Sequence, residues 1–146
     1  MGDRRTPGAT SGSGLEQGAG TRDRRVELKP SAGMQATAAE LATYLKPTEL
    51  MPTDGIVRDT ALEITKRART DVDKARAVYE WVVDNTERNP KTRGCGVGDV
   101  KAMLEGNALD GKCADLNALF VALARASGVP ARDVYGVRVA IAASSG

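Results

Sequence analysis

The 146-residue chain contains no histidine, and aromatic residues make up only 3% of it. Without histidine the chain lacks the side chain that most often serves as a general base near neutral pH. The scarcity of aromatic rings, together with a net charge of only +2, leaves little surface for stacking on bases, so we expect no nucleic-acid partner. No apolar run approaches the length needed to cross a bilayer, and we expect no membrane partner.

The first 35 residues contain few large hydrophobic side chains and are rich in Gly, Ser, Thr and Arg. This composition predicts a disordered tail over residues 1–35, followed by a partial domain over residues 36–146. The tail has no apolar segment of the kind found in secretory signals. A cytoplasmic location is therefore the default expectation, although the true compartment is left open.

Apolar periodicity and capping residues predict a series of helices. They are expected over residues 36–45, 59–68, 70 or 71 to about 88, 99–105 and 114–126. Asp59 is the expected N-cap of the second helix, and Gly106 the expected C′ residue of the fourth. The buried face of the second helix is expected to hold Leu62, Ile64 and Ala68, and that of the third Ala75, Val78, Tyr79, Val82 and Val83.

The segment from Ala114 to Ala126 is apolar around most of its circumference, which places it at the centre of a domain. After Gly128 and Pro130, the residues from Asp133 to Ile141 alternate in polarity and predict a strand. A single strand has no partner with which to form a sheet. The sequence therefore predicts an α+β domain that is cut off in its middle.

Cys113 lies where a loop turns into this central helix. Unpaired backbone N–H groups at a helix start and the positive end of the helix dipole favour a thiolate, and the same N–H groups can bind an oxyanion. Lys112 adds a nearby cation if it points toward the sulfur. The competing interpretation is a buried cysteine that only packs, and position alone does not separate the two.

The residues Gly-Lys-Cys-Ala-Asp-Leu-Asn-Ala-Leu-Phe (111–120) and Ala-Arg-Ala-Ser-Gly-Val-Pro-Ala-Arg (124–132) resemble the nucleophile segment of bacterial transglutaminase-like proteins, a papain-type superfamily. The helix containing Ala77–Val83 resembles the helix that packs against it. The resemblance implies the N-terminal helical half of such a domain with the first strand of its antiparallel sheet. It also implies that Cys113 attacks a protein glutamine or peptide amide and forms a thioester, with a protein or peptide as substrate.

The family supplies a histidine and an Asp or Asn on later strands, and the chain stops before them. We therefore expect an incomplete catalytic triad and no turnover by this chain alone. Cys95 stands in a glycine-rich loop whose spacing does not fit a phosphate-binding motif. A metal site built from Cys95 and Cys113 would need further ligands that no Cys or His can supply, so we expect no metal, no cofactor and two free thiols.

Two alternatives to an enzyme domain stay open. The chain could be a non-catalytic interaction fragment, with an open strand edge from Val134 to Val139 available to a partner or to self-association. It could also be the product of a truncated open reading frame with no stable fold.

Overall fold

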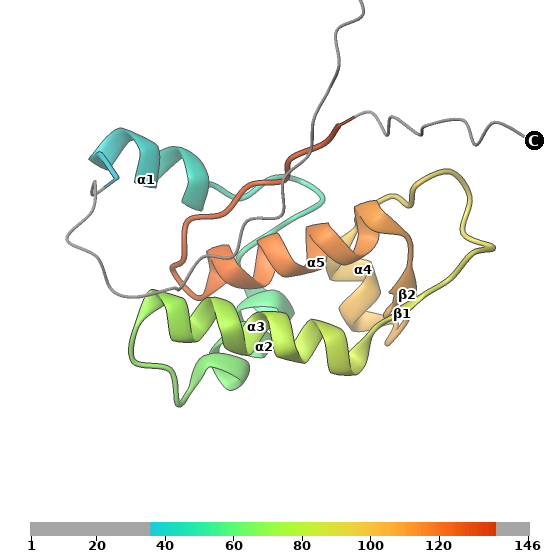
Figure 1. The fold of residues 1–146 in the computed structure, drawn as a ribbon, viewed down its shortest axis with the longest axis horizontal. Coiled ribbons are helices and arrows are strands. Elements are labelled where there is room, and N and C mark those ends of the chain that lie inside the picture. Colours follow the sequence, from blue (N-terminus) through green and yellow to red (C-terminus); the bar gives the residue numbers. More distant parts are fainter. Residues whose placement is uncertain (1–35, 137–146) are drawn as a thin grey trace, which may run out of the picture. The chain divides into compact units, whose positions relative to one another are not determined.

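The computed structural model describes residues 36–136, which form a group of packed helices and one very small sheet (Figure 1). The predicted tail over residues 1–35 and the residues from 137 onward lie outside the described part. The elements are α1 (Ala38–Leu45), α2 (Gly55–Thr65), α3 (Asp71–Asn85), β1 (Glu87–Arg88), α4 (Val100–Glu105), β2 (Asp110–Gly111) and α5 (Cys113–Ala126).

Helix α5 provides the centre of the core, as its apolar composition predicts. Leu119 and Leu123 are completely buried, and α2, α3 and α4 contribute Val57, Val78 and Val100, which are also completely buried. Gly128 ends α5 in the left-handed conformation, with a φ of 87°. The ending at Gly128 confirms the prediction, since glycine adopts this conformation without steric cost.

Helix α2 differs from the prediction both in its start and in its buried face. It begins at Gly55 rather than Asp59, with Asp54 as N-cap. The buried residues are Val57, Ala61 and Thr65, four apart in the sequence, whereas Leu62 is 50% exposed. Small residues at Ala61 and Thr65 let α2 pack closely against α5, and Thr65 satisfies its own hydroxyl by donating to the Ala61 carbonyl at 2.7 Å.

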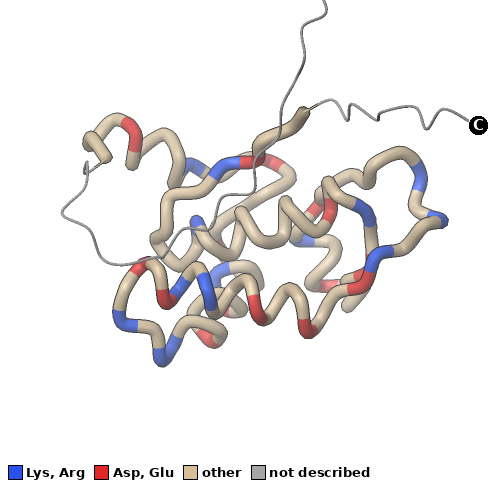
Figure 2. The backbone as a smooth tube through the Cα atoms, in the orientation of Figure 1, with Lys and Arg blue, Asp and Glu red and all other residues tan. Residues whose placement is uncertain are grey.

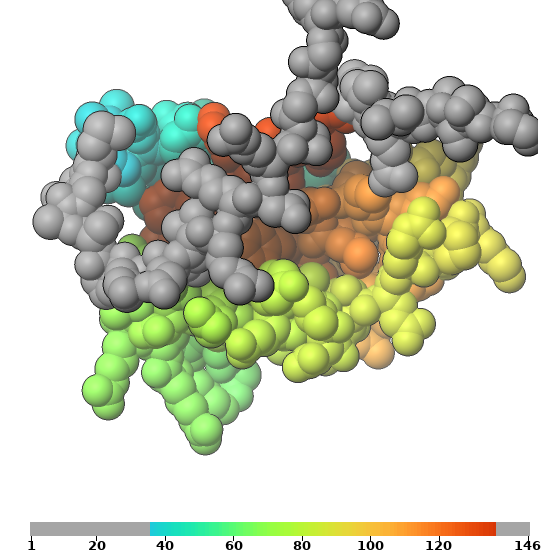
Figure 3. Space-filling view, viewed as in Figure 1, coloured from blue at the N-terminus to red at the C-terminus, as the bar shows by residue number. Residues whose placement is uncertain are grey.

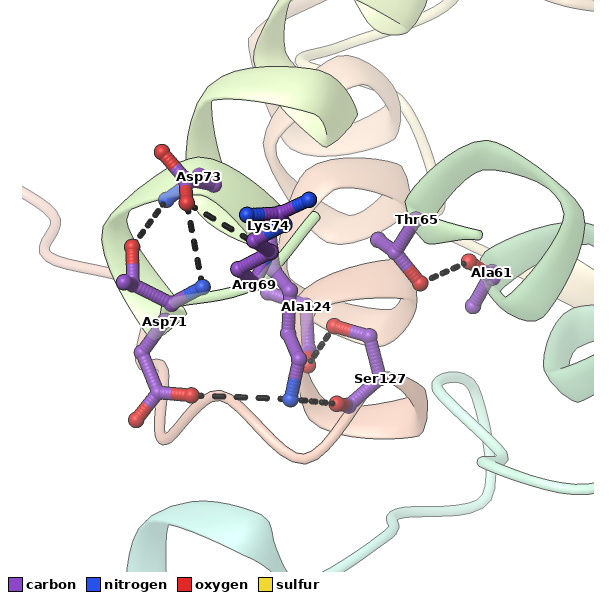
Figure 4. Close-up of polar contacts among 9 residues, drawn as sticks. Ala61, Thr65, Arg69, Asp71, Asp73, Lys74, Ala124 and Ser127 are labelled. Atoms are coloured by element: carbon purple, nitrogen blue, oxygen red, sulfur yellow. Dashed lines mark hydrogen bonds and ion pairs between the residues drawn. The ribbon is translucent and has the colours of Figure 1, made fainter. Parts of the chain in front are cut away.

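Helix α3 begins where expected, because Thr70 forms a capping box with Asp73. Figure 4 shows Asp73 and Lys74 at this start of the helix. The Asp73 N–H donates to the Thr70 hydroxyl at 3.1 Å, and the Thr70 N–H donates to the Asp73 carboxylate at 3.0 Å. These bonds lower the pKa of Asp73. Lys74 in the first turn donates to the Ser127 carbonyl at 3.1 Å, which links the start of α3 to the end of α5.

The buried face of α3 is narrower than the apolar spacing indicates. Val78 is buried and Val82 packs against the core, but Tyr79 is 61% and Val83 57% exposed. Trp81 also packs against the core. The reason is that α5 and α2 contact only one side of α3 within the described residues.

Helix α4 is capped by Asp99, the first residue of the predicted helix, whose carboxylate accepts from the Ala102 N–H at 3.0 Å. The prediction for Gly106 is wrong. Gly106 has a φ of −84° and ends the helix in right-handed geometry. The left-handed residue is Asn107, with a φ of 48°, a conformation that asparagine tolerates better than most residues.

The sheet of the described residues is parallel, whereas the prediction was an antiparallel one. Strand β1 pairs with β2 in the register Glu87–Asp110 and Arg88–Gly111. The connection through α4 returns the chain in the same direction, which permits parallel pairing. The residues from Asp133 to Gly136 form no strand, because no described segment pairs with them, and the rest of the expected strand lies outside the described residues.

The segment that follows α5 packs against α1 instead. The Ala131 N–H donates to the Tyr44 carbonyl at 3.1 Å, and the Arg125 guanidinium donates to the Lys46 carbonyl at 3.0 Å. The Arg132 guanidinium lies 5.4 Å from the centre of the Tyr44 ring. These contacts fix the direction in which the chain leaves the core.

Candidate functional site

Cys113 is the first residue of α5, directly after β2, and its side chain is exposed. The Lys112 backbone is extended, with φ −113° and ψ −168°, so the chain turns sharply into the helix at this point. The expected place of the sulfur at the start of a nonpolar helix is therefore confirmed. Its chemical role stays a prediction.

The N–H groups at this helix start are not all free, contrary to the simple expectation. The Ala114 N–H donates to the Cys95 carbonyl at 2.9 Å, and the Lys112 N–H donates to the Asp115 carboxylate at 2.9 Å. Among residues 36–136, the N–H of Cys113 itself has no hydrogen-bond partner. This donor, adjacent to the sulfur, is the one available to a negatively charged oxygen.

Asp115 organises the site, and the sequence patterns did not single it out as a functional residue. Its side chain is only 7% exposed. One carboxylate oxygen accepts from the N–H groups of Val97 and Gly98, both at 2.9 Å. The other oxygen accepts from Lys112, so the carboxylate joins the glycine-rich loop to the first turn of α5.

The pKa of Asp115 is lowered although burial, the largest single influence, acts to raise it. The backbone N–H groups of Lys112, Gly98 and Val97 outweigh this influence because they bind the charged form. Asp115 is therefore a structural anion, and its lone pairs are occupied. It is not positioned as a free base.

At two positions of this site the Asp115 carboxylate lies so close to the backbone that only glycine fits. A Cβ on Gly96 would lie 2.0 Å from a carboxylate oxygen, and one on Gly111 2.5 Å from it. Gly96 also has a φ of 97°. The repeated glycines of residues 94–98 were the signal in the sequence, but their partner lies seventeen or more residues away and cannot be read from spacing.

Cys95 lies in this loop, as expected, and its side chain is exposed. Both cysteines are free thiols in the structure. The Lys112 ammonium donates to the Gly94 carbonyl at 3.1 Å, so this cation is directed at the loop backbone. Cys95 and Cys113, eighteen residues apart in the sequence, are thus brought to the same end of α5.

Basic residues lie along the loop between β1 and α4. Figure 2 shows Lys and Arg residues along the loop that follows β1, and this loop carries Lys91 and Arg93. The pKa of Tyr135 is raised, first by partial removal from water and then by its proximity to Asp133 and Cys95. The chain after α5 thus passes close to the cysteine loop.

Of the hollows elsewhere on the described surface, two are lined in part by α5 or β2. One, of about 310 Å³, is mostly apolar and is lined by Tyr79, Val82, Val83, Leu116, Asn117 and Phe120. It lies between α3 and α5, whose atoms Figure 3 shows side by side. The other, of about 590 Å³, is lined by residues around β1 and β2, and neither hollow includes Cys95 or Cys113.

Among residues 36–136, no helix is both long and apolar enough to cross a membrane. Within the same residues, no group of three or more His, Cys, Asp or Glu side chains is arranged to hold a metal ion.

Comparison with known proteins identifies the class. The family model described as the transglutaminase-like superfamily matches residues 58–144, which include all of α3, α4 and α5. The chain belongs to the transglutaminase-like superfamily. The resemblance inferred from the Cys113 segment is thereby confirmed at the level of the family.

A relative with sequence similarity is an uncharacterized protein of Haemophilus influenzae. It is 41% identical over 109 residues, a match that covers 75% of this chain and 30% of the relative. The match to this chain thus spans less than a third of the relative's length. No solved structure matches the chain.

Proposed function

We propose that Cys113 is the nucleophile of a cysteine-dependent acyl transfer. Its thiolate adds to the carbonyl carbon of a glutamine side chain or peptide-like amide. The C–N bond then breaks, and ammonia or an amine leaves with a proton. The thioester that remains on Cys113 passes its acyl group to an amine or to water.

The observation that carries this proposal is the exposed sulfur at the first residue of α5, beside its own N–H, which has no partner among residues 36–136. An attacking sulfur must reach a carbonyl carbon from solvent, which a buried cysteine cannot do. The adjacent N–H can donate to the oxygen that becomes negative in the tetrahedral intermediate. Membership of the transglutaminase-like superfamily supports the same assignment.

We also propose that this chain alone does not turn over amide substrates. The 146 residues contain no histidine, and the carboxylate nearest in sequence to Cys113, Asp115, is occupied by backbone N–H groups. An amine leaving group needs a proton, and no residue of the described site is placed to supply one. We propose that the base and its orienting partner are provided by residues outside these 146.

The test is acylation by an activated ester such as p-nitrophenyl acetate, because nitrophenolate leaves without a proton and bypasses the missing acid. We expect a burst of nitrophenolate and an acetyl group on Cys113, located by mass spectrometry of the tryptic peptide that begins at Cys113. Added imidazole should accelerate the reaction in place of the absent histidine. Cys113→Ala should lose the burst, and Cys95→Ala, the matched control, should keep it.

Equal acetylation of Cys95 and Cys113, at the rate measured for the urea-unfolded chain, would show that the fold does not activate Cys113. The acyl-transfer role would then be abandoned.

One observation favours a second candidate, a non-catalytic interaction domain. Tyr79 and Val83, 61% and 57% exposed, line the apolar hollow between α3 and α5. Such a surface fits a hydrophobic partner segment. Binding of a hydrophobic dye that Tyr79→Lys abolishes, together with concentration-dependent sedimentation, is expected for this candidate. A dye-silent monomer would contradict it.

A further inference from the structure

The two cysteines approach each other through a backbone contact. The Cys95 carbonyl accepts the Ala114 N–H at 2.9 Å, and Ala114 is bonded to Cys113. With standard bond lengths, this contact keeps the two cysteine Cα atoms within about 8 Å of each other. A disulfide requires a Cα separation of roughly 4.4–6.8 Å, so the pair is within reach of one after a small adjustment.

The loop around Cys95 is held against α5 on both sides of the cysteine. Before it, the Gly94 carbonyl accepts from the Lys112 ammonium at 3.1 Å. After it, the N–H groups of Val97 and Gly98 donate to the Asp115 carboxylate at 2.9 Å. The backbone of Cys95 therefore stays beside Cys113, which gives the two thiols a high effective concentration for each other.

Both thiols are exposed, so a solvent oxidant can reach them. The flanking glycines, Gly94 and Gly96, have φ values of 62° and 97° and carry no side chain that would obstruct the sulfur. Because Cys95 is exposed, packing in the core does not explain its presence.

We infer that Cys95 and Cys113 form an oxidisable dithiol, which a peroxide converts to an intramolecular disulfide. In the first step one thiolate attacks hydrogen peroxide, the O–O bond breaks, and a sulfenic acid forms, while the departing hydroxide takes up the proton that the thiol had lost and leaves as water. The thiol of the other cysteine then attacks the sulfenic sulfur, the S–S bond forms, and a second water leaves. Two thiols lose two electrons, and one peroxide gains them.

The disulfide removes the sulfur of Cys113 from chemistry until a thiol reductant restores it. Regulation of acyl transfer by this disulfide rests on the proposed function, whereas formation of the disulfide itself does not depend on it.

The test is peroxide treatment of the whole chain at low protein concentration, followed by tryptic digestion without reductant. Trypsin places Cys95 in Gly94–Lys101 and Cys113 in Cys113–Arg125. We expect these two peptides to be joined in a monomer that has lost the mass of two hydrogen atoms. Cys113 should become inert to iodoacetamide and recover with dithiothreitol, and Cys95→Ser should abolish the protection.

A matched pair of glycine variants tests the role of the loop. In Gly96→Ala the new Cβ would overlap the Asp115 carboxylate and move the loop. Gly128→Ala introduces the same strain at a φ of 87° with no atom within 4 Å of the Cβ. We expect disulfide formation about tenfold slower in Gly96→Ala and little changed in Gly128→Ala, because thiol attack is sensitive to small displacements.

Oxidation of Cys113 to a sulfinic acid, or into a dimer, while Cys95 stays reduced would overturn the inference. Equal rates in the two glycine variants would also overturn the role given to the loop. If the disulfide forms but the ester does not acylate Cys113, the oxidisable dithiol is supported and the proposed acyl transfer is refuted. If Cys113 is acylated but no disulfide forms, the acyl transfer is supported and the oxidisable dithiol is refuted.

Discussion

Replacing Asp115 with alanine removes the carboxylate that joins the glycine-rich loop to α5. The Gly98 N–H is buried and would have no acceptor, which costs about 1–3 kcal/mol. The N–H groups of Val97 and Lys112 are partly buried and can reach water, so each loses only about 1 kcal/mol. Together these losses should lower the free energy of unfolding of Asp115→Ala by about 3–5 kcal/mol, a large share of the stability of a small domain.

Asp115→Asn removes the negative charge of the side chain but keeps its shape. The amide oxygen can still accept from Val97 and Gly98, but the NH₂ group faces the Lys112 N–H. The folded pKa of Asp115 lies below its ordinary value of 3.8. A depressed folded pKa contributes stability that is present above the unfolded value and is lost as the pH falls through the folded value. The stability difference between wild type and Asp115→Asn should therefore shrink as the pH falls below about 4.

The assay is urea unfolding followed by the fluorescence of Trp81, the single tryptophan, which packs against the core. Glu40 and Asp73 also have lowered pKa values, but they are unchanged in both proteins and cancel in the comparison. Wild-type and Asp115→Ala midpoints that coincide near neutral pH would refute the reasoning. A wild-type to Asp115→Asn difference that stays constant on acidification would refute the electrostatic part.

Three further predictions concern the core, a helix cap and a glycine. Leu119→Ala should lower the free energy of unfolding by about 3 kcal/mol because the Leu119 side chain is completely buried. Leu62→Ala should lower it much less, because Leu62 is 50% exposed, and urea unfolding of the two variants measures the difference. Thr70→Ala should lower the free energy of unfolding by about 1 kcal/mol and increase hydrogen exchange in the first turn of α3. Gly111→Ala should lower the melting temperature because its Cβ would lie 2.5 Å from the Asp115 carboxylate, and an unchanged melting temperature would contradict that contact.

The positions of α3, α4 and α5 could be predicted because their signals are local. Thr70 and Asp99 cap helices through residues three positions later, and Gly128 ends one through its own backbone freedom. The start of α2 was misplaced because Asp54 and Asp59 offer the same capping side chain, and the local sequence does not choose between them. Helix boundaries depend on which residues the core accepts, and Val57 is completely buried in it.

The candidate site was predicted in part. Cys113 could be found because a glycine, a cysteine and an apolar helix follow one another in the chain. The role of Asp115 could not, because its partners Val97 and Gly98 come from a distant loop. Strands β1 and β2 were missed for a related reason, since two-residue strands such as Glu87–Arg88 carry no alternating pattern and exist only through their partner.

The amino-acid sequence alone determined that a cysteine stands at the entrance of a nonpolar central helix, because helix starts and apolar faces are encoded within a few neighbouring residues. Only the tertiary structure decided what surrounds that cysteine. The Cys95 loop lies at the start of α5, where the Ala114 N–H holds it, and the Cys113 N–H has no partner within the described part of the chain. These contacts join residues far apart in the chain, and their geometry follows from the packing of the core rather than from any local pattern.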